Sequence, residues 1–446
     1  MGNITMHSSA SQSKLSDFFE LNVIARFFLP LFHASELCQK QLHHTMKNRL
    51  DNSIFHGMLF SMEIKRLKEL KIIKDRIKES PIVAILGPRQ CGKTTLSNQF
   101  AKTVNTKSVH FFDLEDYRDL SRLDNPILAL EQLSGYIIID EIQKKPEIFP
   151  VIRVLSDKNP KNRYIILGSA SRDLIAQSSE TLAGRISYLE MSGFSLEHIA
   201  LKDIKKLWLR GGFPRSFLSK NELSSFSWRQ DFIRTFLERD IPNLGLNIPV
   251  KALRRFWIML SHYHGQIFNA SEIGKSLSIS DNTARKYLDI LSGTFLIRQL
   301  QPWYYNTKKR LVKRPKIYFR DSGILHALLS LETSMDIARH PKMGASWEGF
   351  ALEQIVTYLN LTEEEVFFWA VHTGAELDLL FQKHGKLWGI ETKYSDAPKI
   401  TKSMISAIKE LSLAHLWIIY PGKVSYPLSK NISVVPLKEF SKIDPQ

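Results

Sequence analysis

The residues best suited to chemistry form one contiguous run that ends in a lysine and two threonines: Gly87-Pro88-Arg89-Gln90-Cys91-Gly92-Lys93-Thr94-Thr95. The run fits the spacing G-x-x-x-x-G-K-[ST], whose glycines let backbone N–H groups turn towards the phosphates of a nucleotide. In this pattern Lys93 neutralises the β- and γ-phosphate oxygens, and the Thr94 hydroxyl ligates Mg²⁺. An apolar segment, Ile82–Leu86, comes directly before the run, and a helix predicted over 94–102 points its positive dipole end at the anion. The sequence therefore predicts that residues 87–95 bind ATP together with Mg²⁺.

Two carboxylates, Asp140 and Glu141, follow a second apolar run, Tyr136–Ile139. Downstream of a phosphate-binding loop, an apolar strand that ends in two acids is typical of enzymes that hydrolyse ATP. Asp140 would hold Mg²⁺, and Glu141 would orient and deprotonate the attacking water. A third apolar run, Tyr164–Leu167, leads to Ser169, a candidate sensor of the γ-phosphate; the alternative is a plain turn serine.

Arg185 is a candidate for a catalytic arginine that reaches the site of a neighbouring copy of the chain. An arginine supplied in this way stabilises the charge of the phosphoryl-transfer transition state. The role would require a homo-oligomer. Arg172 is a weaker candidate, and for both residues the alternative is a solvated arginine.

The apolar runs alternate with helical patterns between residues 62 and 195. The runs that predict strands are Ile82–Leu86, Val109–Leu114, Tyr136–Asp140 and Tyr164–Leu167. Continuous apolar runs are typical of strands that are buried on both faces of a parallel sheet. The alternation therefore predicts an α/β domain with a doubly wound parallel sheet.

Residues 253–303 have the pattern of a winged helix-turn-helix. The pattern predicts a helix over Ala270–Leu277, a second helix over Asp281–Leu291 and a first wing strand over Phe295–Leu300. In DNA-binding versions the second helix enters the major groove, which would expose Arg285 and Lys286 to DNA. The alternative is a winged helix that packs as a lid and does not contact DNA.

A basic stretch without acidic residues follows the second helix: Arg298, Lys308, Lys309, Arg310, Lys313, Arg314 and Lys316. Trp303, Tyr304 and Tyr305 lie among these cations, and basic plus aromatic residues suit phosphate neutralisation with base stacking. We therefore expect residues 308–314 to contact DNA. The alternative is a solvated loop.

Residues 335–440 contain a helix, three strands, a helix and a strand in that order. The order resembles the PD-(D/E)XK nuclease-like fold. The resemblance implies a site in which Asp378 and Glu391 bind Mg²⁺, Glu348 completes the ligand set, and Lys393 positions hydroxide or stabilises charge at the phosphate. The alternative is a structural ion pair between Glu and Lys side chains on one face of the sheet.

The order of all these pieces resembles the prokaryotic AAA-type P-loop ATPases that carry a C-terminal domain of unknown function. The resemblance covers about residues 62–440 and includes these segments: Gly87–Thr94, Tyr136–Gln143, Leu167–Ser171, Leu182–Arg185, Gly211–Pro214 and Glu238–Asp240. It implies ATP binding and an architecture: an AAA-like P-loop domain, a winged helix and a small α/β nuclease-like domain.

Composition narrows the class of protein. The chain has 446 residues, of which 43% are hydrophobic and 24% charged, and these fractions exclude a wholly disordered or collagen-like protein. Two cysteines cannot form a disulfide framework and fit a reducing compartment. We expect a cytoplasmic protein with no membrane partner, since no run of about 18 apolar residues exists. A formal net charge of +16 favours nucleic acid as a partner.

These patterns predict five segments. They are a leader over 1–61, poorly ordered or upstream of a true start at Met62; a P-loop ATPase domain over 62–200; a helical extension over 201–252; a winged helix with the basic stretch over 253–320; and a nuclease-like domain over 335–440. The leading hypothesis is an ATP-hydrolysing protein coupled to a nuclease-like domain that acts on or near DNA. The alternatives are an ATP-dependent DNA-cleaving nuclease, and a nucleotide-operated switch or DNA-binding protein without nuclease activity.

Overall fold

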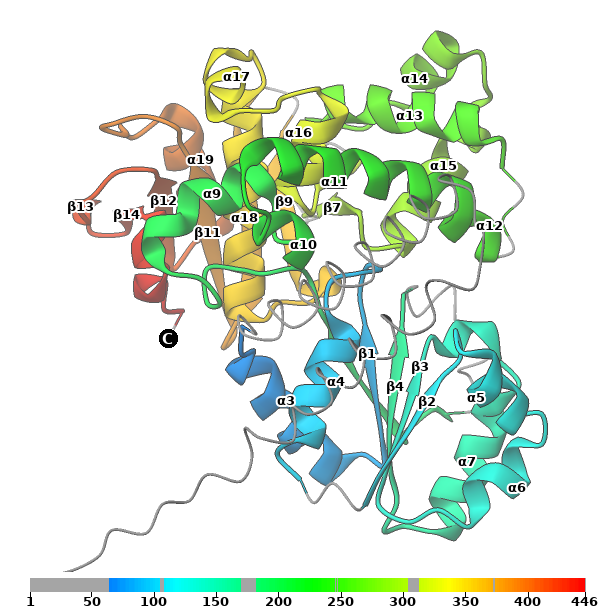
Figure 1. Cartoon of the computed structure of the whole chain (residues 1–446). Helices are drawn as coiled ribbons and strands as arrows, with labels where there is room; N and C mark the ends of the chain where they lie inside the picture. Colours follow the sequence, from blue (N-terminus) through cyan, green and yellow to red (C-terminus); the bar gives the residue numbers. More distant parts are fainter. Residues whose placement is uncertain are drawn as a thin grey trace, which may run out of the picture. The chain divides into compact units, whose positions relative to one another are not determined.

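The computed structural model describes residues 64–104, 108–169, 182–244, 246, 248–303, 313–371 and 374–445 (Figure 1). Residues 65–446 group into one unit. The predicted leader lies outside the described residues, as do Arg172, Lys308, Lys309 and Arg310. In the part of the chain that the structure describes, every helix is too short or too polar to span a membrane.

Among the described residues, five parallel strands form the first sheet, in the spatial order β2-β3-β4-β1-β5. The strands are β1 (Ile82–Leu86), β2 (Val109–Asp113), β3 (Tyr136–Asp140), β4 (Arg163–Gly168) and β5 (Ile186–Glu190). The pattern predicted the first four because parallel strands buried on both faces are apolar throughout. It missed β5, which lies at the edge of the sheet and is only partly buried.

Helices cover both faces of this sheet (Figure 1). On one side are α3 (Leu67–Glu79) and α4 (Lys93–Ala101), and on the other are α5 (Tyr117–Arg122), α6 (Pro126–Glu131) and α7 (Ile148–Lys158). Successive strand side chains point to opposite faces, so Val83 and Ile85 join one core while Ile82 and Ala84 join the other. The predicted α/β architecture with a parallel sheet is therefore confirmed.

The segment after this sheet is helical. It comprises α9 (Ile204–Arg210), α10 (Pro214–Phe217), α11 (Glu222–Thr235), the π-helical turn η6 (Phe236–Asp240) and α12 (Ile241–Asn243). Phe213, Phe232, Phe236 and Trp257 form a row of ring contacts, with successive centroids 4.7, 6.3 and 5.2 Å apart. These rings belong to the same hydrophobic core as α3 and α4, so the first sheet and the helical segment share one core.

The following elements are α13 (Val250–His262), β6 (Gln266–Ile267), α14 (Ala270–Leu277), α15 (Asp281–Gly293), β7 (Ile297–Pro302) and β8 (Lys316–Phe319). Both predicted helices are present, and Ser280 begins α15 by accepting a hydrogen bond from the Thr283 N–H at 3.1 Å. The strand begins at Ile297 rather than at the predicted Phe295, because Phe295 has a positive φ of 61° that a strand does not allow.

In the described chain, β7 and β8 belong to a second sheet of nine strands, in the order β13-β14-β12-β11-β10-β9-β7-β8-β6. Between β8 and β9 lie α16 (Ser322–Leu328), α17 (Ser334–Arg339) and α18 (Met343–Leu359). The remaining elements are β9 (Val366–Ala370), β10 (Glu376–Lys383), β11 (Lys386–Thr392), α19 (Lys402–Leu411), β12 (His415–Tyr420), β13 (Tyr426–Ser429) and β14 (Ile432–Pro436). Gln301 pairs with Phe367 in parallel, so the predicted segments 253–320 and 335–440 contribute to one sheet.

A buried histidine joins three helices across these segments. His326 of α16 lies 2.7 Å from the Ser346 hydroxyl of α18 through Nε2, and 3.1 Å from the Leu209 carbonyl of α9 through Nδ1. Burial lowers the pKa of His326 to about 3, so the ring is neutral at physiological pH. The contact links the helical segment to α18, which also carries Glu348.

Candidate functional site

The loop between β1 and α4 has the shape that its glycines allow. A Cβ atom on Gly87 would lie 2.0 Å from the Met191 carbonyl oxygen, so the end of β5 can approach the loop because residue 87 is glycine. Gly92 begins α4 with a φ of +103°, in the left-handed region that favours glycine. The Lys93 ammonium donates to the carbonyls of Gly87 at 2.9 Å and Pro88 at 3.0 Å. The predicted phosphate-binding loop therefore curls around its own lysine.

Thr94 and Asp140 meet at the carboxyl end of the sheet. The Thr94 hydroxyl donates to Asp140 Oδ2 at 2.5 Å, although the two residues come from α4 and β3. Burial raises the pKa of Asp140 above its ordinary value, and the neighbouring Glu141 charge raises it further. A cation beside this oxygen pair would relieve that cost, and oxygen donors are what Mg²⁺ prefers.

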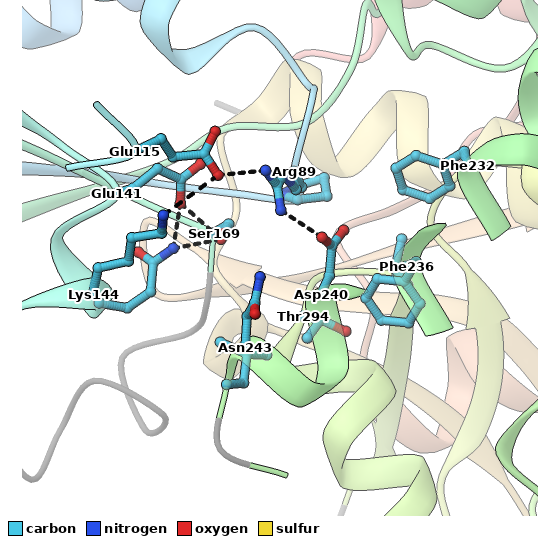
Figure 2. A pocket seen from close by; sticks show the side chains of 14 residues that line it. Arg89, Glu115, Glu141, Lys144, Ser169, Phe232, Phe236, Asp240, Asn243 and Thr294 are labelled. Atoms are coloured by element: carbon cyan, nitrogen blue, oxygen red, sulfur yellow. Dashed lines mark hydrogen bonds and ion pairs between the residues drawn. The ribbon is translucent and has the colours of Figure 1, made fainter. Parts of the chain in front are cut away.

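Glu141 and Ser169 also lie together, as Figure 2 shows. The Ser169 hydroxyl is 3.3 Å from Glu141 Oε2 and 2.9 Å from the Gln143 side-chain nitrogen, which also donates to Glu141. Glu141 holds a positive φ of 53°, which turns the chain directly after β3. The structure thus brings the predicted base and the predicted sensor together. Sequence reasoning gave no role to Gln143, although it belongs to the segment that carried the family resemblance.

Arg89 of the loop bridges two carboxylates (Figure 2). Its guanidinium contacts Glu115, which follows β2, and Asp240, which ends η6, each at 2.5 Å. A small cavity that is partly open to solvent is lined by these three residues and by Glu141 and Ser169 among others. Glu115 and Asp240 were not predicted to belong to the site.

Arg185 lies at the opposite end of the sheet from the loop. Its backbone carbonyl accepts a hydrogen bond from Ile82, the first residue of β1, whereas the loop follows the last residue of that strand. Its guanidinium pairs with Asp157 at 2.7 and 3.0 Å. The structure therefore does not place Arg185 in the site of its own chain, and action on a neighbouring copy stays a prediction.

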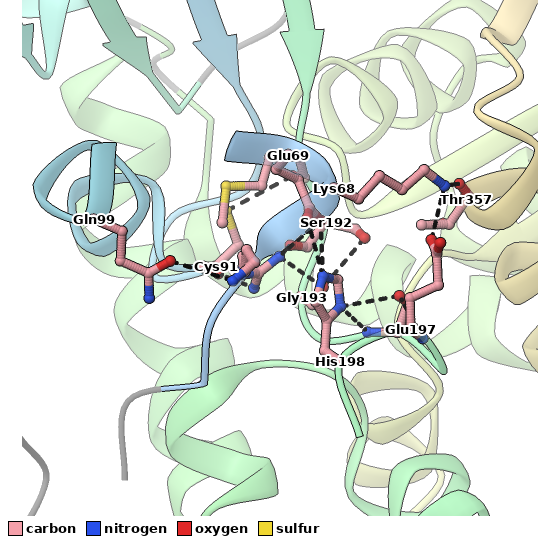
Figure 3. A network of polar contacts seen from close by, with 12 residues as sticks. Lys68, Glu69, Cys91, Gln99, Ser192, Gly193, Glu197, His198 and Thr357 are labelled. Atoms are coloured by element: carbon pink, nitrogen blue, oxygen red, sulfur yellow. Dashed lines mark hydrogen bonds and ion pairs between the residues drawn. The ribbon is translucent and has the colours of Figure 1, made fainter. Parts of the chain in front are cut away.

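A buried arginine, Arg66, lies directly before α3 and contacts the loop. Arg66 donates to the Cys91 carbonyl at 2.9 Å and to the Ser192 carbonyl at 3.1 Å, and so ties the loop to the segment after β5. Nearby, Glu69 contacts His198 at 2.9 Å (Figure 3). Arg66 was missed by sequence reasoning because it precedes the motif by more than twenty residues. Cys91 is fully buried.

The second candidate site is a cluster of acids at the larger sheet, of which Asp378 and Glu391 are buried and Glu348 is partly buried. Asp378 of β10 accepts hydrogen bonds from the Thr392 N–H at 2.8 Å and from the Thr392 hydroxyl at 3.0 Å. Glu391 of β11 pairs with Lys393 at 2.6 Å. Glu348 of α18 accepts a hydrogen bond from the Tyr318 hydroxyl at 2.5 Å. We name Glu348, Asp378 and Glu391 the acidic cluster.

Glu348 and Glu391 of the acidic cluster have raised pKa values. Burial and the nearby Asp378 raise the pKa of Glu348 to about 7 and that of Glu391 to about 8. Within the described residues, Glu391 Oε2 is buried and has no hydrogen-bond partner. Such an oxygen fits a cation, but no group of three His, Cys, Asp or Glu side chains in the described ranges converges closely enough to hold a metal ion.

Lys316 supplies a cation to the acidic cluster. Its ammonium lies 3.8 Å from Glu348, 3.8 Å from Asp378 and 3.6 Å from Glu376. Burial disfavours the charged form of Lys316, but the carboxylates outweigh burial and raise its pKa. The sequence pattern placed Lys316 in a basic stretch suited to nucleic-acid binding, with a solvated loop as the alternative. The structure corrects both interpretations for this residue, because its side chain is buried beside the acidic cluster.

Three family models match consecutive parts of the chain. A model described as an AAA domain matches residues 79–200, and two domains of unknown function, DUF8612 and DUF4143, match residues 201–335 and 343–440. Uncharacterized proteins of Mycobacterium tuberculosis and Mycobacterium bovis are each 44% identical to the chain over 376 residues, which is 84% of this chain and 84% of each relative. The chain is an AAA-domain protein and belongs to their family.

The AAA domain contains the whole predicted nucleotide site from residue 87 to Ser169, which confirms the prediction of an AAA-type P-loop ATPase domain. Nucleotide binding is the property that this class of domain implies. A single model spans residues 201–335, a range that includes the predicted helical extension over 201–252 and the predicted winged-helix segment over 253–320. A Walker-type ATPase of Pyrococcus abyssi is similar in structure, with 14% identity and a TM-score of 0.43 over 60% of this chain and 96% of that one.

In this AAA-domain protein, the described basic residues of α15 and of the basic stretch are of two kinds, exposed and buried. Arg285, Lys286, Lys313 and Arg314 are exposed. Arg298, in contrast, is buried and pairs with Glu353 of α18 at 2.5 Å. Arg298 and Lys316 therefore do not belong to a solvent-facing basic patch, because buried carboxylates already neutralise both of them.

Proposed function

We propose that the chain binds ATP with Mg²⁺, hydrolyses it, and couples the reaction to its C-terminal nuclease-like domain on or near DNA. The observation that carries the proposal is the convergence of Lys93, Thr94, Asp140 and Glu141 at one edge of the parallel sheet. Thr94 and Asp140 would hold Mg²⁺, which offsets the negative charge of the phosphates. Homo-oligomer formation, with Arg185 acting in trans, belongs to the same proposal.

The chain's own groups account for the reaction at the γ-phosphate. Lys93 would exchange its loop carbonyls for phosphate oxygens, which are stronger partners for an ammonium. Glu141 would accept a proton from the attacking water. Ser169 and Gln143, which contact each other and Glu141, would position that water.

The order α13, β6, α14, α15, β7, β8 supports a winged helix, since two antiparallel strands follow the helix pair. Arg285 and Lys286 are exposed on α15, the helix that enters the major groove in DNA-binding winged helices. We propose that these residues, together with Lys313 and Arg314 and the basic residues 308–310, contact the phosphates of DNA.

Replacement of Lys93 by alanine tests the proposed nucleotide site. We expect the wild type to bind and hydrolyse ATP with Mg²⁺, and Lys93→Ala to weaken ATP binding at least about tenfold, because a charged phosphate contact is lost. Equilibrium binding of a fluorescent ATP and phosphate release measure the two properties.

The matched control is Lys161→Ala, which removes an exposed lysine just before β4, at the opposite end of the same sheet from the loop. It is expected to leave nucleotide binding unchanged. If the wild type fails to bind ATP, or if Lys93→Ala binds it as tightly as the wild type, the proposed site is wrong.

DNA cleavage is a second candidate function, favoured by the buried oxygen of Glu391 that has no partner among the described residues. For this function, Glu391→Gln and Asp378→Asn are expected to lower both Mn²⁺-dependent cleavage and Mn²⁺-induced thermal stabilisation, with metal affinity falling at least about tenfold. Glu364→Gln, an exposed control, is expected to change neither.

If the wild type neither cleaves DNA nor gains thermal stability with Mn²⁺, the nuclease function is wrong. This result would support a nucleotide-operated switch or DNA-binding protein without nuclease activity, in which Lys316 serves as the permanent counter-charge of the acidic cluster.

A further inference from the structure

Arg89 lies in the phosphate-binding loop, yet the loop pattern itself requires no arginine at this position. Its side chain points into the cavity that Glu141 and Ser169 also line, on the side where the proposed base and sensor lie (Figure 2). Two carboxylates, Glu115 and Asp240, hold its guanidinium. Arg89 is thus a second cation of the loop, besides Lys93, and it lies on the side of the loop where the proposed base Glu141 and the proposed sensor Ser169 are found.

Asp240 ends a π-helical segment. It is the last residue of η6, a π-helical turn between α11 and α12. Such turns are rare in proteins, and those that occur often lie at functional sites. Phe236, at the start of η6, packs against Trp257 of α13 with ring centroids 5.2 Å apart. A change at Asp240 would therefore reach the helices that precede α14 and α15 through direct contacts.

We propose that Arg89 senses the nucleotide: its guanidinium leaves Asp240 for the terminal phosphate of a bound nucleoside triphosphate, and the release loosens η6 and α12. The inference rests on the proposed ATP binding and adds a residue role to that site. A guanidinium binds phosphate through paired hydrogen bonds, and a triphosphate brings several negative charges towards Glu115 and Asp240. Repulsion between these carboxylates and the phosphate favours the exchange.

A nucleoside diphosphate lacks the phosphate that would compete for Arg89. The contact with Asp240 then persists, and the two nucleotides hold the segment in different states. A ligand shifts such an equilibrium by its difference in affinity for the two states, so the triphosphate favours the released state. In this way the chain would report the form of its bound nucleotide to the helical segment without a second subunit.

The test compares a non-hydrolysable ATP analogue with ADP in the full-length chain, using calorimetry for affinity and hydrogen exchange for peptides that cover residues 232–244. In the wild type, we expect the analogue to raise exchange in these peptides relative to ADP. Asp240→Asn is expected to raise exchange with either nucleotide. Arg89→Ala is expected to lower the ratio of analogue to ADP affinity at least about fivefold.

Two further variants make the result specific. Arg89→Lys retains the charge but cannot form the paired contacts, so we expect it to lose the nucleotide-dependent exchange difference. Arg118→Ala, which removes an exposed arginine paired with Asp116, is expected to behave as the wild type. Circular dichroism confirms that each variant is folded.

An Arg89→Ala protein that keeps the wild-type affinity ratio overturns the inference, and so does equal exchange with both nucleotides in the wild type. If the wild type binds neither nucleotide, the result is a different one, since it would contradict the proposed function itself.

Discussion

Replacement of Glu141 by glutamine is expected to lower the rate of ATP hydrolysis by about 10²–10⁴-fold while ATP remains bound. The amide keeps the size of the side chain and can still contact Gln143 and Ser169, but it cannot accept the proton of water. Lys93, Thr94 and Asp140 are unchanged, so the groups proposed to bind phosphate and Mg²⁺ remain. Single-turnover hydrolysis and equilibrium ATP binding measure the two properties separately.

Glu147→Gln provides the matched control because Glu147 is an exposed acid only six residues further along the chain. This variant is expected to hydrolyse ATP at the wild-type rate. Hydrolysis by Glu141→Gln within tenfold of the wild type would rule out Glu141 as the base, and a parallel loss of ATP binding would assign it a binding role instead.

The second large effect concerns stability, at the buried pair of Arg298 and Glu353. The two side chains are 3% and 7% exposed and form hydrogen bonds at 2.5 and 3.0 Å between β7 and α18. Glu353→Met is expected to lower the free energy of unfolding by about 3–5 kcal/mol, because it leaves the Arg298 guanidinium buried without its carboxylate. Urea unfolding followed by circular dichroism measures the loss.

The double variant Arg298→Met with Glu353→Met distinguishes charge from packing. Removal of both charges avoids an unpaired buried ion, so the double variant is expected to recover most of the stability lost in Glu353→Met. Lys158→Met, in an exposed pair with Glu131, is expected to cost less than about 1 kcal/mol. A Glu353→Met protein as stable as the wild type would show that the pair contributes nothing.

The nucleotide site was predictable because its signals are local. The loop, its preceding strand and its following helix are contiguous, and the carboxylates Asp140 and Glu141 end a strand whose apolar run is unmistakable. The carboxyl ends of parallel strands meet at one edge of a sheet, so the sequence order also indicated that Thr94 and Asp140 would converge. The edge strand β5 lacks a continuous apolar run, and the same reasoning missed it.

For the basic stretch, prediction from neighbouring residues in the sequence was wrong at two positions. Seven cations without an intervening acid suggested a nucleic-acid-binding stretch, but β7 and β8 carry two of them, Arg298 and Lys316, into the interior. Their partners lie on α18 and β10, far along the chain, so no local pattern could indicate them. The number of basic residues is known from the composition, but only the exposed ones can contact a partner molecule, and the folded structure determines which those are.

The α/β class, the position of the phosphate-binding loop and the helix pair at 270–293 could be predicted from sequence, because each depends on residues that are neighbours in the chain. The tertiary structure alone decided that Arg89 meets Asp240, that Lys316 enters the acidic cluster, and that the strands of two predicted segments share one sheet. These contacts join residues that only the folded chain brings together, and buried charges must find such partners because leaving one unpaired in the interior costs several kcal/mol.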